Sequence, residues 1–140
     1  RSQYDLLSEL IVDSGEWKMQ FKFDAVVPVP LYKDRLKERG FNQAEIIAKI
    51  LAKNLPAGRQ VENLLQRIKD TGHQTLRNRA QRIEAMKNAF QISSASRRIK
   101  IPEAVLLVDD VWTTGATMGE CCKVLKKAGV KKVWGFVLAR

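Results

Sequence analysis

The chain has 140 residues, 45% of them hydrophobic, which is enough to bury the core of one domain and excludes a wholly disordered chain. No apolar run has the length of a membrane span, so we expect no membrane contact, no signal peptide and a cytoplasmic location. The formal charge of +10 favours anionic partners such as polyphosphates or nucleic acid, although dispersed basic residues also suit a solvated surface.

The first half of the chain predicts two helices and two strands. Apolar residues at helical spacing predict a helix over Tyr4–Val12, and a buried strand follows over Phe23–Val29. A second helix begins behind Asn42, whose spacing to Glu45 resembles a capping box. The remaining expectations are a basic loop before Asn42, a stop for that helix at Pro56-Ala57-Gly58, and a second strand over Val61–Leu65.

The second half predicts further alternation of strands and helices. We expect a mobile loop over Lys69–Thr75, a helix over Arg77–Lys87 with Ala80, Ile83 and Ala85 or Met86 turned inward, a strand over Ala89–Ile92, a polar connection over Ser93–Lys100, a strand over Ala104–Val108, a helix from Met118 to a stop at Gly129, and a strand over Lys132–Leu138. This order predicts an α/β fold with a parallel sheet and right-handed crossovers. We expect one domain over 1–140, with residues 1–20 as an N-terminal helix and linker and 21–140 as the core.

The stretch from Val105 to Met118 carries the strongest functional signal. Four apolar residues end in Asp109 and Asp110, and a loop of small and hydroxyl residues, Thr113 to Thr117, leads into a helix. Ligands of open α/β sheets bind beyond the carboxyl ends of the strands, and a helix start binds anions. Two carboxylates beside such a loop suit a ribose 5-phosphate with magnesium. The alternative is an ordinary strand-to-helix turn with both acids on the surface.

A second cluster of charges follows the first strand. Lys33, Arg35, Lys37 and Arg39 lie in the expected loop, and guanidinium groups suit pyrophosphate oxygens. The helix start at Asn42 would add a weak attraction of the same sign. The spacing alone fits a solvated loop of alternating charges equally well.

Cys121 and Cys122 are neighbours on a predicted helix and lack the spacing of zinc ligands. We interpret them as reduced core thiols, with a reactive pair as the alternative.

Two motifs resemble a known family. The stretch from Val105 to Met118 resembles the phosphoribosyl-pyrophosphate (PRPP) signature of type I phosphoribosyltransferases. The run Val-Pro-Val-Pro-Leu, followed by Arg-Leu-x-x-Arg-Gly-Phe-Asn-Gln-Ala, is similar to the hallmark of the ComF family, amidophosphoribosyltransferase-like proteins linked to DNA uptake in naturally transformable bacteria. The resemblance covers Phe23 to Arg140 and implies the three-layer fold of type I phosphoribosyltransferases, with helices flanking a central, mostly parallel sheet.

The resemblance implies a role for each matching segment. It assigns PRPP binding to Asp109, Asp110, Thr113, Thr114, Gly115, Ala116 and Thr117, pyrophosphate binding to Pro30, Leu31, Arg35 and Arg39, and a flexible catalytic flap to Gln74, Arg79 and Arg82. The implied activity is a magnesium-dependent transfer of ribose 5-phosphate to an unknown acceptor, with Mg²⁺ held mainly through PRPP and no direct protein ligand. Further expected partners are single-stranded DNA, DNA-uptake proteins or a second copy in a homodimer.

The sequence also departs from the family pattern. Members usually carry an N-terminal four-cysteine zinc module, which nothing in the sequence resembles, and Ala85-Met86 stands where they typically have Asn-Val. Thr113 replaces the acidic base of purine-using relatives, which disfavours a purine acceptor. His73 is interpreted as a surface residue, with proton transfer as the alternative. The rival function is a non-catalytic PRPP- or DNA-responsive accessory protein.

Overall fold

The computed structural model describes residues 22–55, 60–70, 78–94, 101–111 and 115–139. Within them lie β1 (Ala25–Pro28), α3 (Lys33–Arg39), α4 (Gln43–Lys53), β2 (Gln60–Val61), β3 (Leu65–Arg67), α5 (Arg79–Met86), β4 (Phe90–Ile92), β5 (Ala104–Val111), α6 (Ala116–Lys127) and β6 (Lys132–Ala139). The helix expected over Tyr4–Val12 and most of the loop expected over Lys69–Thr75 lie outside these residues.

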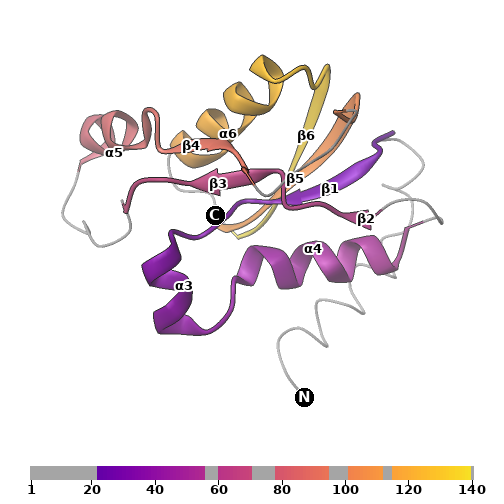
Figure 1. Ribbon diagram of the computed structural model, residues 1–140, viewed down its shortest axis with the longest axis horizontal. Coiled ribbons are helices and arrows are strands. Elements are labelled where there is room, and N and C mark those ends of the chain that lie inside the picture. Colours follow the sequence, from indigo (N-terminus) through magenta and orange to yellow (C-terminus); the bar gives the residue numbers. More distant parts are fainter. Residues whose placement is uncertain (1–21, 56–59, 71–77, 95–100, 112–114, 140) are drawn as a thin grey trace.

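A four-stranded parallel sheet forms the middle of the molecule, in the order β2-β1-β5-β6. Strands β1 and β5 occupy its centre, paired from Ala25 opposite Val105 to Pro28 opposite Val108. Both are runs of buried apolar residues, as expected of strands covered on both faces. Figure 1 shows the sheet between α6 and α4, which confirms the predicted three-layer α/β arrangement.

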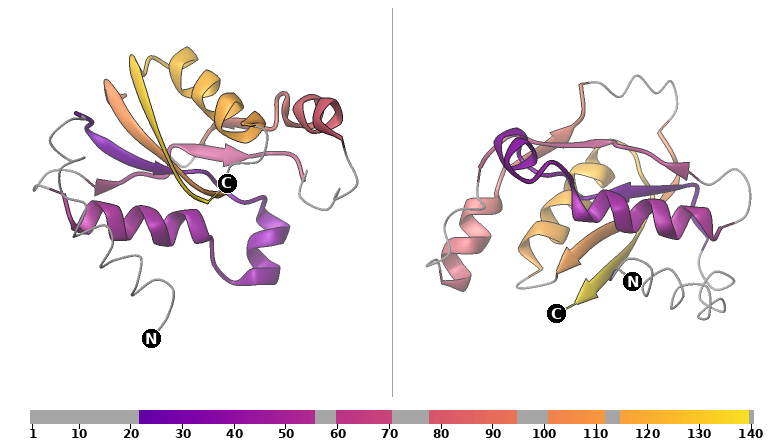
Figure 2. Two further views of the ribbon diagram at one scale, coloured as in Figure 1. Left: turned by 180° about the vertical axis from the view of Figure 1, so that it is seen from behind. Right: turned by 90° about the horizontal axis from the view of Figure 1, so that it is seen from below.

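Alternate residues of the central strands pack into two different hydrophobic cores, one on each face of the sheet, because successive side chains of a strand point to opposite faces. Val27 and Leu107 pack on the side of α6, where Met118, Cys121 and Leu125 are buried. The other face packs against α4 and has its own core of buried residues: Phe23, Val26, Ile47, Ala48, Leu51, Leu106 and Val108. Figure 2 shows α4 and α6 on the two sides of the sheet.

Strands β3 and β4 form a separate two-stranded antiparallel ribbon that packs beside α6. The single strand predicted over Val61–Leu65 is therefore wrong, because Val61 ends β2 and Leu65 begins β3. The chain leaves the central sheet at Glu62, whose N–H donates to Val26 O at 2.9 Å, and turns through a 3.0 Å bond from Leu64 N–H to Glu62 O. Periodicity cannot detect this change of sheet, because strands of two and three residues are too short to show an alternation of their own.

The basic loop predicted after β1 is also wrong, because Lys33–Arg39 forms helix α3. Its residues are good helix formers, with Asp34 in the first turn and basic residues in the last. Gly40 ends the helix at φ 80°, and its N–H donates to Leu36 O at 2.7 Å.

The other elements lie close to their predicted positions. In α5 the expected inward face is only partly present, since Ala80 and Ile83 are exposed while Ala85 and Met86 are half-buried. In the part of the chain that the structure describes, no helix has the length and apolarity needed to cross a membrane.

Candidate functional site

The carboxyl end of β5 carries two adjacent carboxylates, Asp109 and Asp110, both half-buried. The N–H of Asp110 donates to Asp109 Oδ1 at 2.9 Å. Burial and, secondly, the neighbouring Asp110 carboxyl raise the pKa of Asp109 to about 7, while the hydrogen bond from Asp110 N–H and the charge of Arg67 act to lower it. Near neutral pH this carboxyl can therefore either accept from a ligand hydroxyl or hold a proton.

The start of α6 follows this strand end. Gly115 caps the helix at φ 80°, a left-handed conformation that favours glycine, and its carbonyl accepts from Gly119 N–H at 2.8 Å. Ala116 and Thr117 form the first turn, so the small-residue loop does lead into a helix as predicted. Thr113 and Thr114 lie outside the described residues.

The segment after β1 stands beside the end of β5. Val29 N–H donates to Val108 O at 2.8 Å, which extends the pairing beyond the strand. Asn42 caps α4 by accepting from Ala44 N–H at 3.1 Å and donates to Val29 O at 3.0 Å. Asn42 therefore fixes the segment after β1 to the start of α4. The cap predicted at Asn42 is confirmed, but its side chain accepts from the N–H of Ala44 and not from that of Glu45. The Glu45 carboxylate instead pairs with Lys49, at 3.1 Å from Oε1 to Nζ.

A cleft of about 480 Å³ opens next to this segment. Pro30 and Leu31, both implied in pyrophosphate binding, line it together with β3 and the start of α3. Its lining mixes apolar residues with the polar residues Tyr32, Gln66, Ser93 and Ser94. Its size is that of a small-molecule site.

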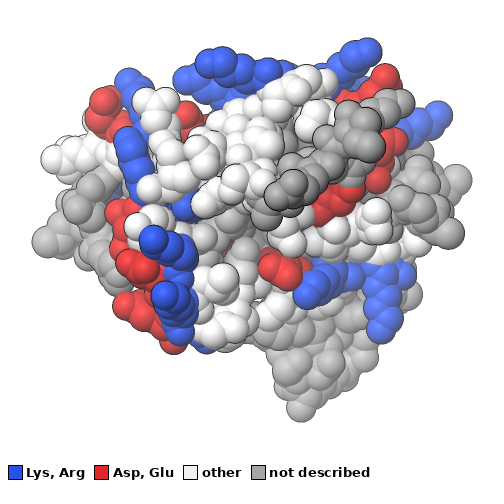
Figure 3. All heavy atoms as spheres, viewed as in Figure 1, with Lys and Arg blue, Asp and Glu red and all other residues white. Residues whose placement is uncertain are grey.

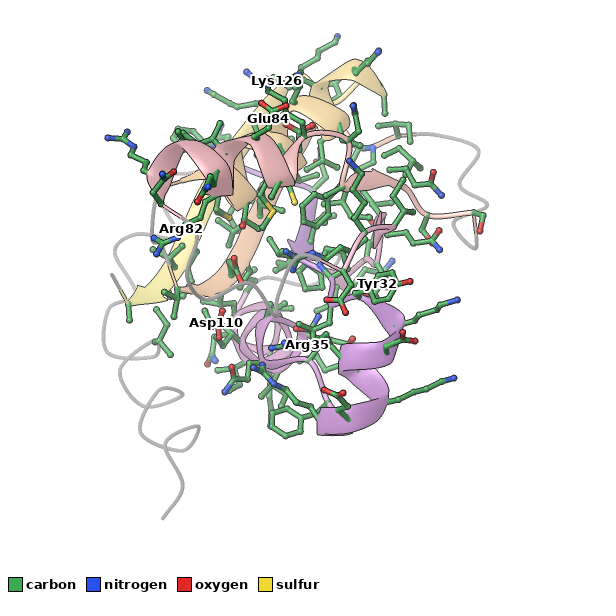
Figure 4. All side chains as sticks on the ribbon, turned by 90° about the vertical axis from the view of Figure 1, so that its left-hand side faces the viewer. Tyr32, Arg35, Arg82, Glu84, Asp110 and Lys126 are labelled. Carbon is green, nitrogen blue, oxygen red and sulfur yellow. The ribbon has the colours of Figure 1, made fainter. Side chains whose placement is uncertain are left out.

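Helix α3 carries the two arginines implied in pyrophosphate binding. Arg35 is half-buried and close enough to Arg67 for its charge to lower the pKa of that residue, whereas Arg39 is exposed one turn farther along. Figure 4 views the end of the molecule where the strands β1 and β5 terminate and shows Arg35 and Asp110 on that end. The structure thus brings Arg35 to the predicted site and leaves Arg39 at its margin.

Arg67 of β3 is a site residue that the sequence analysis missed. Burial lowers its pKa, while the charges of Asp109 and Asp70 raise it. Its guanidinium lies 5.1 Å from the centroid of the Phe90 ring, and Nη2 donates to Met86 Sδ at 3.5 Å. The available signal was strand alternation, which turns Arg67 to the same side as the buried Leu65.

Helix α5 carries Arg79 and Arg82, the implied flap residues, and both are exposed. Asn78 opens the helix with a full capping box to Gln81. The helix contacts α6, and Figure 4 shows Arg82 on the same end of the molecule as Asp110. The catalytic role of Arg79 and Arg82 stays a prediction, and Gln74 and His73 lie outside the described residues.

Two further features of the site region are the exposed lysines and the two cysteines of α6. Figure 3 shows Lys and Arg side chains gathered over α6, where Lys123, Lys126 and Lys127 are exposed. Cys121 is buried and Cys122 half-buried, both free, and burial raises the pKa of the Cys121 thiol. Cys121 is therefore a neutral core thiol as expected. Among the described residues, no three His, Cys, Asp or Glu side chains come together as a metal site.

The chain was compared with known protein families and with curated proteins. No protein-family model matches the chain. Competence protein F of Haemophilus influenzae is 37% identical over 118 residues, covering 83% of this chain and 51% of that protein. Competence protein ComFC of Streptococcus pneumoniae is 35% identical over 91% of this chain and 52% of its own length.

The DNA utilization protein YhgH of Salmonella typhimurium is also similar, with 30% identity over 96% of this chain and 57% of that protein. The chain thus spans about half the length of the curated relatives it matches. These similarities extend over both the motif that resembles the ComF hallmark and the motif that resembles the PRPP signature, and the similar proteins are named for competence and DNA utilization.

Proposed function

We propose that this domain binds PRPP with Mg²⁺ and transfers its ribose 5-phosphate to an acceptor, with loss of pyrophosphate. The observation that carries the proposal is the pairing of two half-buried carboxylates at the end of β5 with a glycine-capped helix start directly behind them. A pentose with a 5-phosphate has the hydroxyls and the dianion that these two features bind.

The start of α6 is assigned to the 5-phosphate. The left-handed Gly115 turns the chain into the helix, and Ala116 adds only a methyl group, so the backbone stays open to a phosphate. Thr117 contributes a hydroxyl from the first turn. These groups hold the substrate without taking part in bond changes.

Asp109 and Asp110 are assigned to the ribose hydroxyls. Each ionised carboxylate accepts hydrogen bonds, and the positive charge that develops on the sugar as the bond to pyrophosphate breaks is stabilised by nearby negative charge. Because its raised pKa lies near 7, Asp109 loses its proton when it accepts from the diol at neutral pH.

Arg35 and the segment of Pro30 and Leu31 are assigned to the departing pyrophosphate. The guanidinium neutralises charge on the leaving oxygens, and the segment pinned by Asn42 sets where they lie. The carboxylate pair fits a hydrated divalent cation, and Mg²⁺ bound through PRPP would supply further charge neutralisation of the pyrophosphate. A nitrogen acceptor then forms the new bond to the anomeric carbon.

Calorimetric titration with PRPP and Mg²⁺ tests the binding step, and release of pyrophosphate in the presence of nitrogen acceptors tests turnover. We expect saturable PRPP binding that Asp109→Asn with Asp110→Asn weakens by about tenfold or more, at unchanged circular dichroism. Unchanged affinity in the folded double variant would contradict the assignment.

A second candidate is a non-catalytic accessory protein in DNA uptake that responds to PRPP or DNA. The names of the relatives favour it, since two are competence proteins and a third is a DNA utilization protein. The exposed lysines of α6 suit a phosphate backbone. PRPP binding without pyrophosphate release from any acceptor tested would favour this candidate.

A further inference from the structure

The thioether of Met86, at the end of α5, receives two donors from different elements. Arg67 Nη2 of β3 donates to Met86 Sδ at 3.5 Å, and Thr117 Oγ1 of α6 donates to the same atom at 3.7 Å. A thioether is a weak acceptor. One sulfur atom therefore lies where a charged donor and a hydroxyl donor converge.

The guanidinium of Arg67 is held in this place by its surroundings. Arg67 stands opposite Phe90 in the β3–β4 register, and its guanidinium carbon lies 5.1 Å from the centroid of that buried ring. Stacking on a ring orients a guanidinium while leaving its edge for other partners. Arg67 also lines the cleft with Pro30 and Leu31, and the charge of Asp109 raises its pKa. It thus stands between the two halves of the candidate site.

We propose that Arg67 and Thr117 form one subsite for a phosphate oxyanion and that Met86 caps this subsite until the anion displaces its thioether. A phosphate presents several charged acceptor oxygens, so one group can take both donors that Met86 Sδ now shares. The inference rests on the proposed function and adds Arg67 as a substrate-binding residue. The anion is the 5-phosphate of the sugar or the pyrophosphate, which share this chemistry.

The test uses protein labelled with ¹³C at the methionine methyl groups. The sequence contains only Met19, Met86 and Met118, and Met86→Leu assigns the resonance of interest. Ribose 5-phosphate and inorganic pyrophosphate are titrated separately, each with Mg²⁺, against sodium chloride at equal ionic strength. We expect a saturable shift of the Met86 methyl with one of the two phosphates and no such shift with chloride.

Three variants sharpen the measurement. Arg67→Gln should weaken binding of that phosphate by about tenfold to a hundredfold, and Arg67→Lys should restore part of the loss. Met86→Leu keeps the volume but removes the sulfur acceptor, so the affinity should rise by about twofold to tenfold. Lys53→Gln removes an exposed cation of α4 and should leave the affinity unchanged, which controls for net charge.

If the Met86 methyl shifts with ribose 5-phosphate and the shift depends on Arg67, the subsite binds the 5-phosphate of the sugar. If it shifts with pyrophosphate instead, the subsite binds the leaving group. Equal losses in Arg67→Gln and Lys53→Gln, or a Met86 methyl that does not respond to either phosphate, overturn the subsite. Pyrophosphate release that is unaffected in Arg67→Gln would leave the proposed function standing while this inference fails. Conversely, Arg67-dependent phosphate binding in a protein that does not bind PRPP would support the subsite and contradict the proposed function.

Discussion

Asp109 is a carboxyl whose surroundings oppose its charge. Burial and the adjacent Asp110 raise its pKa to about 7, while Arg67 is the cation acting against that rise. A folded-state pKa above the usual value means that the folded protein binds the proton more tightly than the unfolded chain does. The contribution of Asp109 to stability is therefore complete below about pH 4 and is lost as the pH rises through about 7.

We predict that Asp109→Asn makes the ligand-free protein more stable at pH 8, by on the order of 1–3 kcal/mol, with little change at pH 4. Asparagine stays neutral at both pH values and so avoids a buried negative charge. Urea unfolding at the two pH values measures the difference. Glu103→Gln is the matched control, because Glu103 is an exposed carboxylate at the start of the same strand region. The same pH dependence in Asp109→Asn as in the unaltered protein would contradict the prediction.

Gly115 and Gly119 belong to the same stretch but differ in conformation. Gly115 has φ 80°, whereas Gly119 lies inside α6 and an added Cβ would meet nothing within 4 Å. We predict that Gly115→Val lowers stability by about 1–2 kcal/mol and ribose 5-phosphate affinity by about tenfold or more. Gly119→Ala should instead stabilise by about 0.5–1 kcal/mol and keep the affinity. Thermal unfolding measures the stability of both variants, and calorimetric titration measures their affinity for ribose 5-phosphate. Unchanged affinity in Gly115→Val would show that the 5-phosphate does not bind at the start of α6.

At the scale of elements, the segment after β1 owes its position to one side chain. Asn42 accepts from Ala44 N–H and donates to Val29 O, so the start of α4 and the end of β1 are joined through a single amide. The sequence predicted the first bond, since a cap acts locally along the chain. The bond to Val29 spans 13 positions and depends on how α3 returns the chain, which no local pattern specifies.

We predict that Asn42→Asp costs about 1–2 kcal/mol of stability and weakens pyrophosphate binding. Aspartate caps helices as well as asparagine does, but it cannot donate to the Val29 carbonyl. Asn42→Ala removes both bonds and should cost more. Urea unfolding ranks the three proteins, and equal stability of Asn42→Asp and the unaltered protein would show that the bond to Val29 contributes nothing.

Helix α3 places its two arginines one turn apart. We predict that Arg35→Ala lowers affinity for Mg²⁺-pyrophosphate by about fivefold to fiftyfold and affinity for ribose 5-phosphate less. Arg39→Ala should act in the same direction but more weakly, because Arg39 is exposed at the end of the helix. Calorimetric titration with each ligand makes the comparison. Equal losses for both ligands would indicate a general electrostatic effect.

At the scale of the whole molecule, the sequence predicts the class of fold and the neighbourhood of the candidate site. The apolar runs of β1 and β5 and the stripes of α4 and α6 follow from periodicity, because each is buried along its length. The β3–β4 ribbon does not, since its three-residue strands are too short to carry a period. The position of Arg67 in the site and the two donors to Met86 Sδ could not be predicted for that reason, because these contacts exist only once the ribbon and α5 pack beside α6.

The charge of the whole molecule can be tested separately from the candidate site. We predict that replacing Lys123, Lys126 and Lys127 by Gln weakens single-stranded DNA binding and lowers the salt slope by about 2, whereas PRPP at saturation does not compete. Fluorescence anisotropy of an oligonucleotide across a salt series measures both. The matched control replaces Lys33, Lys37 and Arg39 of α3 by Gln. Equal effects of the two triple variants would mean that total charge, not a local surface, governs DNA binding.

Strands β1 and β5 are hydrogen-bonded neighbours, so the two ends that we propose to bind anions begin only one strand spacing apart, about 4.8 Å. The distance between these two strand ends is therefore set by the backbone hydrogen bonds of the sheet and not by side chains. Inserting one residue into either strand near Pro28 or Val108 would shift the pairing register by one position and move the side chains beyond the insertion to the opposite face of the sheet. If the proposed site binds PRPP, we expect loop substitutions to change its affinity, whereas only a change in strand pairing would change the distance between the two strand ends.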